Sequence, residues 1–402
     1  MKRADLAPAL IARLKRYPAP YDSHYGVVPL PPPAEPPAIL GLRDRYETAI
    51  GALARLEALA AELGDGWLVS RLLARREAVT SSAIEGTNST LDELLLIEET
   101  AEEEAAPRQQ AAGQVRDYAL ALERLMPEAR RLGTAMFTRD LVSRLHGAVM
   151  QADPDFPGVP GQIRETVVWI GPPGSGIAYS TYNPAPPEDV PACLEESLAY
   201  MRGEADALLP PSIITRMAVA HAHFEAVHPF TDGNGRVGRL LLPLLMAAER
   251  HIPVYLSPYI EAHRRDYYDA LKAAQQRLAW QEMIGFIASA ITATVAELDE
   301  TRKALARLRA IWEARRRFRV NSASLRALDI LPSYPVITTG RLAGLLGVTF
   351  PAASAAIGQL QEVGILRERT GYQRNRIFAA EEVLTVINRP FGEAPVLPGE
   401  AG

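Results

Sequence analysis

The chain contains 402 residues, with 43 Lys and Arg against 48 Asp and Glu, so its formal net charge is −5. Its hydrophobic content of 48% and charged content of 23% exclude a mainly disordered chain, and the length predicts two to four domains. A single cysteine, Cys193, excludes a disulfide scaffold or a cysteine-based metal site, and no apolar run approaches the ~18 residues of a membrane span, so we expect a cytoplasmic protein without a membrane partner.

Residues 1–110 are expected to form a helical region behind a proline-rich lead. Residues 25–37 contain too many prolines for a helix or a central strand, which predicts an extended segment. Apolar residues recur three and four apart in 39–64 and 67–85, and these predicted helices end at Gly64 and Gly86. The acidic stretch 90–106 predicts a third helix, which ends at Pro107 and whose charges form a solvated face.

Residues 111–295 are expected to form a core domain. β-Branched and aromatic residues flank a glycine- and proline-rich cluster at 171–176, which predicts a hairpin with strands at Thr166–Ile170 and Ile177–Tyr179. Helices are predicted again from Val190, over 212–227, over 236–248 and over 264–298.

The C-terminal part of the chain begins with a strongly basic stretch. Residues 302–319 carry eight basic side chains and one acidic side chain, and 296–320 is expected to be a basic helical linker. Residues 321–388 show the order and spacing of a winged helix-turn-helix domain. Residues 389–402 are rich in proline and glycine, which predicts a disordered tail.

The most informative segment is HPFTDGNGRVGR at 228–239. A helix is expected to end near Val227, and another to begin near Asn234–Arg236. Glycine and asparagine tolerate left-handed backbone and allow neighbouring amides to point to one side. Because the first amides of a helix lack intrahelical partners and lie at the positive end of its dipole, the segment predicts an anion site.

Charged side chains in this segment would complete a site for transfer of a phosphate-bearing group. Arg236 and Arg239 lie three residues apart and could hold further phosphate oxygens. Asp232 is the only carboxylate in the loop and could hold Mg²⁺ together with phosphate oxygens and water. His228 has an imidazole, whose pKa is near ~6.5 in free histidine, so it could take a proton from a hydroxyl. The pattern GxxxxGK[ST] is absent, which argues against a P-loop NTPase.

The stretch HPFTDGNGR resembles the motif HPFx[D/E]GN[G/K]R of the Fic (Fido) family of protein adenylyltransferases. Residues 163–179 are similar to the family's flap, on which a target protein docks by strand addition. The resemblance implies a mainly α fold: a Fic helical core with a β-hairpin flap, followed here by a C-terminal winged helix-turn-helix domain. It also implies ATP as donor, Mg²⁺ as cofactor and a hydroxyl side chain of a target protein as acceptor of AMP.

The resemblance assigns a role to each residue of the motif. His228 would be the base, Asp232 the Mg²⁺ ligand and Phe230 a buried anchor. The remaining motif residues would bind ATP, the α-phosphate at Gly233, Asn234 and Gly235 and the β- and γ-phosphates at Arg236 and Arg239. Gly235, in place of the lysine of the family's kinase branch, favours nucleotidyl over phosphoryl transfer.

A second stretch, Ser81-Ser82-Ala83-Ile84-Glu85-Gly86, resembles the family's inhibitory pattern [S/T]xxxE[G/N]. The resemblance implies that Glu85 pairs with Arg239, which removes the clamp for the γ-phosphate and misaligns the α-phosphate. Ser81 and Gly86 are the other matching positions of the pattern. Because the pattern precedes the core, the chain resembles the family's N-terminally inhibited class.

Three predictions concern binding partners, and for each of them the residues leave an alternative open. Tyr268, Leu271 and Gln275 resemble the family's adenine wall, but helical spacing alone would also make them core residues. A homodimer is an open alternative, and another nucleotide or phosphate-linked group would use the same phosphate grip. His221 and His223 are expected to be packed in the core and not to bind a metal.

The winged helix supports an alternative function as a DNA-binding regulator. The basic stretch and four arginines of the expected wing would favour phosphate contacts, namely Arg367, Arg369, Arg374 and Arg376. The expected recognition helix, 350–360, contains no lysine or arginine, and Gln359 alone could reach a base edge. We therefore expect any DNA binding to lack sequence specificity.

Overall fold

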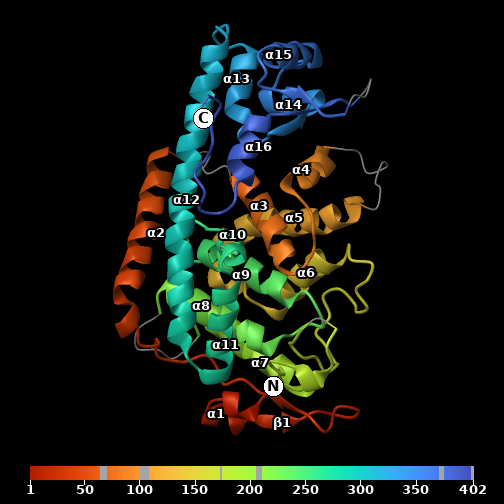
Figure 1. Ribbon diagram of the computed structural model, residues 1–402, viewed down its shortest axis with the longest axis vertical. Coiled ribbons are helices and arrows are strands. Elements are labelled where there is room, and N and C mark those ends of the chain that lie inside the picture. The colour runs from red at the N-terminus through yellow and green to blue at the C-terminus, as the bar shows by residue number, and fades with distance from the viewer. Residues whose placement is uncertain (64–69, 100–107, 173, 205–210, 371–374, 400–402) are drawn as a thin grey trace. The chain divides into compact units, whose positions relative to one another are not determined.

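The computed structural model describes residues 1–63, 70–99, 108–172, 174–204, 211–370 and 375–399, so the predicted breaks at Gly64 and Pro107 and the wing residue Arg374 lie outside the described residues. The described chain is mainly helical, as predicted (Figure 1). It divides into two compact units, Met1–Glu57 with Asp117–Thr292 and Ala58–Arg116 with Ala293–Gly402. Three long helices contribute residues to both units: α2 (Arg43–Leu63), α5 (Arg108–Leu132) and α12 (Trp280–Arg315).

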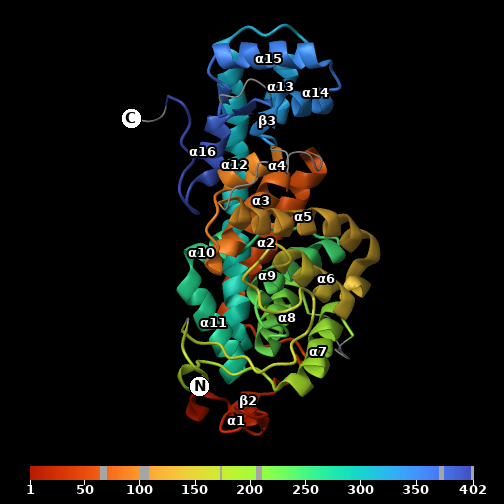
Figure 2. The ribbon, with the colours of Figure 1, turned by 90° about the vertical axis from the view of Figure 1, so that its right-hand side faces the viewer.

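The first unit is built around two buried helices, α8 (Ile213–Val227) and α9 (Asn234–Ala248). Every residue of α8 is buried, because its apolar side chains extend around the whole helix. A Cβ at Gly238 would lie 2.4 Å from Oε1 of Glu225, so glycine permits α9 to approach α8 closely. The neighbours of this pair are α6 (Arg139–Met150), α7 (Val190–Arg202) and α11 (Arg264–Arg277) (Figure 2).

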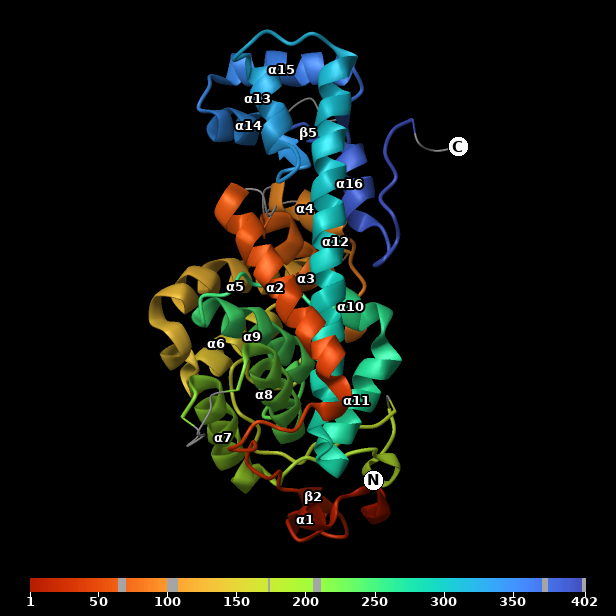
Figure 3. The ribbon, with the colours of Figure 1, turned by 90° about the vertical axis from the view of Figure 1, so that its left-hand side faces the viewer.

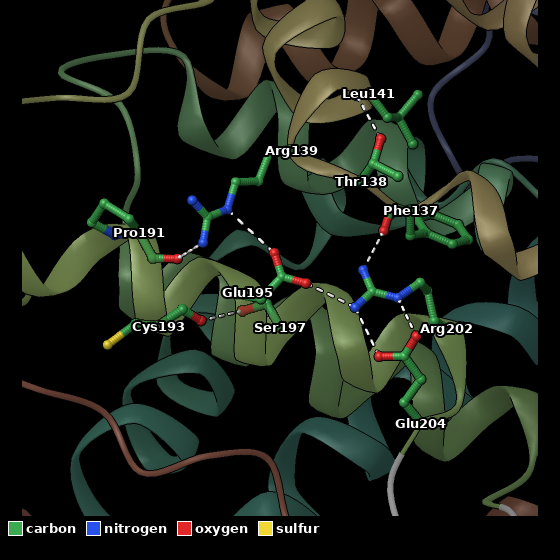
Figure 4. A network of polar contacts seen from close by, with 10 residues as sticks. All are labelled: Phe137, Thr138, Arg139, Leu141, Pro191, Cys193, Glu195, Ser197, Arg202 and Glu204. Carbon is green, nitrogen blue, oxygen red and sulfur yellow. Dashed lines mark hydrogen bonds and ion pairs between the residues drawn. The ribbon is translucent and has the colours of Figure 1, made fainter.

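Polar contacts fix α7 beside the beginning of α6 (Figure 4). Thr138 caps α6, its Oγ1 accepting from the amide of Leu141 at 3.2 Å. Glu195 of α7 pairs with Arg139 at 3.2 Å and with Arg202 at 2.8 Å, and Arg202 also donates to the carbonyl of Phe137 at 2.8 Å. These contacts connect the two helices that flank α8 and α9.

The N-terminal segment forms a small hairpin that the sequence did not predict. Strand β1 (Leu14–Arg16) pairs antiparallel with β2 (Tyr25–Val27), with Leu14 opposite Val27. The extended prediction for 25–37 is therefore corrected at its first residues, which form a strand, because the prolines begin only after Val28. The other short elements of this unit are η1 (Arg3–Asp5), α1 (Pro8–Ile11), η2 (Leu40–Leu42), η5 (Gly133–Met136), η7 (Pro187–Asp189) and α10 (Ser257–Ala262).

The flap region, 163–179, closes as a loop held by a single antiparallel bridge between Ile170 and Tyr182. The amide of Ile170 donates to the carbonyl of Tyr182 at 2.8 Å. The predicted second strand is wrong, because Ile177–Tyr179 forms the 3-10 helix η6. Trp169 is held within the loop, its Nε1 donating to the carbonyl of Ser175 at 3.0 Å.

The second unit contains α3 (Ser70–Ile84), α4 (Leu91–Glu99) and the C-terminal elements (Figure 3). The C-terminal elements follow the order α13 (Ala323–Ile330), β3 (Val336–Thr338), α14 (Thr339–Leu346), α15 (Phe350–Glu362), β4 (Arg367–Glu368), β5 (Ile377–Ala379) and α16 (Glu381–Asn388). Their antiparallel sheet has the order β3-β5-β4. This is the element order predicted for the winged helix-turn-helix, with β3 and α16 as additions.

Three predictions in the C-terminal third of the chain are corrected by the structure. The helix predicted over 264–298 breaks at Leu278, which has a φ of +57°, and the range 296–320 is no separate linker, because α12 continues unbroken to Arg315. The predicted disordered tail is ordered over its described residues. Leu397 is buried there, and Arg389 is paired with Glu297 at 2.9 Å.

Within the described residues, no single helix has the length and apolarity needed to cross a membrane, and one bent pair of helices, α14 with α15, meets that test by length and composition alone.

Candidate active site

The predicted loop lies between the two central helices of the first unit. α8 ends at Val227, and His228 follows it with a φ of +51° in the left-handed region. Gly233 precedes α9 with a φ of +75°, and a Cβ there would lie 2.7 Å from Sδ of Met150. Both the backbone conformation and the close approach therefore require glycine at position 233.

The side chain of Asn234 closes the loop from within. Its Oδ1 accepts from the amide of Phe230 and its Nδ2 donates to the carbonyl of Phe230, both at 2.9 Å. Asn234 and Phe230 are both buried, as expected for an anchor. The sequence analysis placed Asn234 among the phosphate-binding residues, and with the side chain occupied only its main-chain amide could serve that role.

Main-chain amides converge at the beginning of α9, next to Gly235. The first intrahelical bond runs from the amide of Val237 to the carbonyl of Gly233 at 3.0 Å. The amides of Asn234, Gly235 and Arg236 precede it and have no acceptor within the helix. This is the arrangement that binds anions.

The two arginines of the motif lie on α9 and are buried. Arg236 is 4% exposed and Arg239 is 1% exposed. Arg236 donates to Sδ of Met150 at 3.0 Å, its Nε has no hydrogen-bond partner, and no carboxylate of the described residues pairs with it. Burying a guanidinium without a counter-charge is unfavourable, so the position fits an anionic ligand.

Asp232 is the exposed carboxylate of the loop. Its Oδ1 accepts from the amide of Gly233 at 2.6 Å, which fixes the carboxylate at the beginning of α9. The described residues contain no cluster of three or more His, Cys, Asp or Glu that could hold a metal by themselves. A lone carboxylate fits Mg²⁺ when phosphate oxygens and water supply the other ligands.

His146 supports the loop from α6, and the sequence analysis missed it. Its Nδ1 accepts from the amide of Gly161 at 2.7 Å, so Nε2 carries the proton and donates to the carbonyl of Asp232 at 3.1 Å. Its ring stacks on Phe230 with 3.8 Å between centroids. Burial lowers the pKa of His146 to about 4, which keeps the ring neutral. The only sequence signal was a polar residue on the buried face of a predicted helix.

Arg164 supports the loop from the beginning of the flap and was also missed. Its Nε donates to the carbonyl of His228 at 2.7 Å, and its own amide donates to the carbonyl of Pro229 at 2.9 Å. Its remaining nitrogens donate to the carbonyls of Thr166, Ala185 and Val227. No pattern in the sequence indicates an arginine whose partners are main-chain carbonyls.

The three residues predicted for the adenine wall lie on α11, spaced so that they share one face. Leu271 is buried, Gln275 is half-buried and Tyr268 is 47% exposed. The neighbouring Tyr267 is buried and bonds Nε2 of His221 through its hydroxyl at 2.7 Å.

The residues of the predicted inhibitory pattern end α3 in the second unit. Ser81 is fully buried, and Gly86 has a φ of +90°. The amide of Gly86 donates to the carbonyl of Ala83 at 3.1 Å, and that of Thr87 donates to Ser82 at 3.0 Å. Glu85 therefore lies between the end of α3 at Ile84 and the glycine that terminates it.

The sequence matches two family models. Residues 136–246 match the Fic/DOC family and residues 43–125 match the Fic/DOC family N-terminal region. Protein adenylyltransferase fic-1 of Caenorhabditis elegans is 38% identical over 114 residues, which are 28% of this chain and 20% of that protein. A probable protein adenylyltransferase of Aquifex aeolicus is 30% identical over 100 residues, 25% of this chain and 28% of that protein. The chain thus spans less than a third of the length of either relative.

The fold agrees with these matches. A crystal structure of a Fic family protein from Desulfovibrio desulfuricans G20 superposes with a TM-score of 0.53 at 18% identity, covering 87% of this chain and 98% of that chain. The matched ranges contain both the loop at 228–239 and helix α3. The chain thus matches the Fic/DOC family over residues 43–125 and 136–246, and its fold resembles that of a Fic family protein.

Proposed function

We propose that the protein is an adenylyltransferase that transfers AMP from ATP to a hydroxyl side chain of a target protein. The observation that carries the proposal is the buried, carboxylate-free Arg236 beside the converging amides at the beginning of α9. The names of the matched relatives, which are protein adenylyltransferases, support the same reaction.

In the proposed reaction, the imidazole of His228 takes the proton of the target hydroxyl. The hydroxyl oxygen then forms a bond to the α-phosphorus of ATP, while the bond to the oxygen bridging the α- and β-phosphates breaks and pyrophosphate leaves. Asp232 would hold Mg²⁺, which supplies positive charge to the phosphates when bound. The amides of Gly233, Asn234 and Gly235 would hold the α-phosphate, and Arg236 and Arg239 would hold the β- and γ-phosphates.

We also propose that Glu85 restrains this reaction. By competing with the γ-phosphate for Arg239, Glu85 would leave ATP bound with its α-phosphate out of line, and an error of about 1 Å can lower a rate by about 10²-fold. The inhibitory pattern in the sequence and the position of Glu85 directly after the end of α3 support this proposal.

Incorporation of label from ATP tests both proposals. With the label on the α-phosphate, we expect Glu85→Gly to raise self-modification strongly and Glu85→Gly with His228→Ala to abolish it. His251→Ala is the matched control, because His251 pairs with Glu57 at 2.6 Å and is not part of the loop. Equal incorporation by wild type and Glu85→Gly would contradict the role of Glu85.

The position of the label separates adenylyl transfer from the alternatives. Label that transfers from the γ-phosphate and not from the α-phosphate would show phosphoryl transfer. Preferred incorporation from labelled GTP, CTP or UTP would show that the loop uses another nucleotide.

A further inference from the structure

Arg164 is a buried cation whose partners are all main-chain carbonyls. Only 4% of the residue is exposed, and no carboxylate pairs with it among the described residues. Burial lowers the pKa of its guanidinium to about 10, which leaves the side chain charged at neutral pH. Its acceptors include the last carbonyls of α8, where the helix dipole is negative, so the charge is favourable at this place.

The contacts of Arg164 bracket the proposed base. The side chain binds the carbonyl of His228, and the main-chain amide binds the carbonyl of Pro229. His228 has a φ of +51°, a conformation that non-glycine residues rarely adopt without support. We infer that Arg164 is the positioning residue that holds His228 at the angle required for proton abstraction, an inference that rests on the proposed function.

Lysine at position 164 tests this inference, because it keeps the charge and loses the planar fork of donors. In the Glu85→Gly protein, we expect Arg164→Lys to lower kcat about tenfold or more while the KM for ATP changes less than about twofold. Arg216→Lys is the matched control. Arg216 is also a buried arginine of the first unit, but it pairs with the carboxylate of Glu249. Its replacement is expected to leave kcat and KM unchanged.

A spectroscopic measurement keeps this test independent of the proposed reaction. The ring signals of His228, assigned by comparison with His228→Ala in histidine-labelled protein, are expected to move in Arg164→Lys and to stay in Arg216→Lys. Unchanged signals together with an unchanged kcat would overturn the inference. Loss of kcat in Arg164→Lys with unmoved ring signals would also overturn it. Moved signals in a protein without transfer activity would instead count against the proposed function.

A separate observation concerns α3, whose arginines make buried ion pairs within the second unit. Glu98 of α4 pairs with both Arg71 and Arg75 of α3, with 2.9 Å to Arg75. Glu297 of α12 accepts from Arg76 at 3.3 Å and pairs with Arg389 at 2.9 Å. The exposed fraction of each of these side chains is 13% or less, so solvent screens the pairs weakly.

The C-terminal elements continue these contacts. Arg71 stacks on the ring of Tyr334 at 4.5 Å and donates to the carbonyl of Ser333 at 3.3 Å. Glu99 of α4 accepts from the amide and the hydroxyl of Thr338, both at 3.4 Å. The last turn of α4, and α3 through Arg71 and Arg76, are thus attached to residues 333–338 and to Arg389.

We propose, on the basis of the role assigned to Glu85, that the C-terminal elements hold the inhibitory helix α3 in its restraining position. Removing the shared carboxylate of Glu297 would leave Arg76 and Arg389 buried without a counter-charge, so α3 would lose one of its attachments.

The test measures self-modification and the exchange of α3 amides in the full chain. Glu297→Gln is expected to raise modification several-fold when Glu85 is present, to add nothing in Glu85→Gly, and to speed amide exchange in α3. Glu362→Gln is the matched control, because Glu362 pairs only at the surface with Arg316. Arg76→Lys provides a second variant should Glu297→Gln fold poorly.

The outcomes separate the two levels of this proposal. The attachment would be overturned if Glu297→Gln and Arg76→Lys show the same level of self-modification as wild type while Glu85→Gly is more active. The role of Glu85 would remain intact in that case. Unchanged exchange of α3 amides would also overturn the attachment. Suppose instead that the α3 amides exchange faster in Glu297→Gln, but that no variant, including Glu85→Gly, shows raised self-modification. This result would count against the role of Glu85 and would leave the attachment supported.

Discussion

Three histidines in the first unit are buried and neutral. Burial lowers the pKa values of His146, His221 and His223 to about 4, about 3 and about 4. Each has partners that suit the neutral ring; His223, for example, bonds Oγ of Ser197 through Nδ1 at 2.6 Å and the carbonyl of Leu30 through Nε2 at 3.0 Å. The prediction that His221 and His223 are packed residues is confirmed.

These lowered pKa values predict a loss of stability in acid. The pKa of an unfolded histidine is near ~6.5, so between about pH 6.5 and 4 the unfolded chain binds more protons than the folded chain. Stability is therefore complete above about pH 6.5 and declines as the pH falls toward 4, by up to about 1.4 kcal/mol per pH unit for each such histidine. Urea unfolding at pH 7, 6 and 5 measures this decline.

A variant isolates the histidine contribution from that of the carboxylates. His223→Gln is expected to be less stable than wild type at pH 7 but to lose less stability between pH 7 and 5, because one proton fewer is taken up on unfolding. His251→Gln is the control, since His251 lies at the surface beside Glu57. Parallel declines in wild type and His223→Gln would contradict the prediction.

The motif residues of the active site could be predicted from sequence because their chemistry depends on neighbours along the chain. His228, Asp232 and Gly233 lie in one loop between helices that the apolar spacing indicates, and Gly235 lies in the first turn of the second helix. His146 and Arg164 could not be predicted in the same way. Their partners are backbone groups distant in sequence, and any residue type would present the same carbonyl or amide.

At the scale of elements, periodicity was a better guide than composition. The basic stretch at 302–319 was separated from the core because its charge changes, yet α12 continues through it to Arg315. Buried Leu305, Leu308 and Trp312 keep the apolar spacing of the helix, and the basic stretch contains no glycine or proline. A change of charge alters the exposed face of a helix without ending it.

In the flap and in the acidic helix α4, the local sequence pattern predicted the wrong structure. β-Branched residues predicted two strands in the flap, but the glycines and prolines between them leave room for only one bridge and the 3-10 helix η6. The acidic charges of α4 were expected to face solvent, yet Glu98 and Glu99 are largely buried against arginines. Long-range ion pairs of this kind have no local signature.

At the scale of the whole molecule, the basic residues expected to contact DNA are largely paired within the second unit. In the basic stretch of α12, Arg302 and Lys303 pair with Asp299, Arg309 pairs with Asp329, Arg315 pairs with Glu382 and Arg316 pairs with Glu362. In the wing region, Arg369 pairs with Glu381 at 2.7 Å and Arg376 pairs with Glu368. These pairs reduce the positive field that draws a protein to phosphates.

In the expected recognition helix, α15, the side chain that could reach a base already has a hydrogen-bond partner. Gln359, the one side chain of α15 proposed to reach a base edge, accepts from the hydroxyl of Ser324 at 2.6 Å. Phe350 at the beginning of α15 is 60% exposed and offers no hydrogen bond to a base. Direct readout of sequence requires donors and acceptors at the groove edge, so α15 is poorly suited to it.

We therefore expect the protein to bind duplex DNA weakly and without sequence preference. Titration of labelled random duplexes, followed by fluorescence anisotropy, should show binding that disappears at about 0.15–0.2 M salt, because only phosphate contacts would contribute. Gln359→Ala should leave this binding unchanged, whereas Arg317→Ala with Arg319→Ala should weaken it. Enrichment of one sequence from a random pool at physiological salt, lost in Gln359→Ala, would contradict the expectation and would make the DNA-binding regulator the better account of the C-terminal elements.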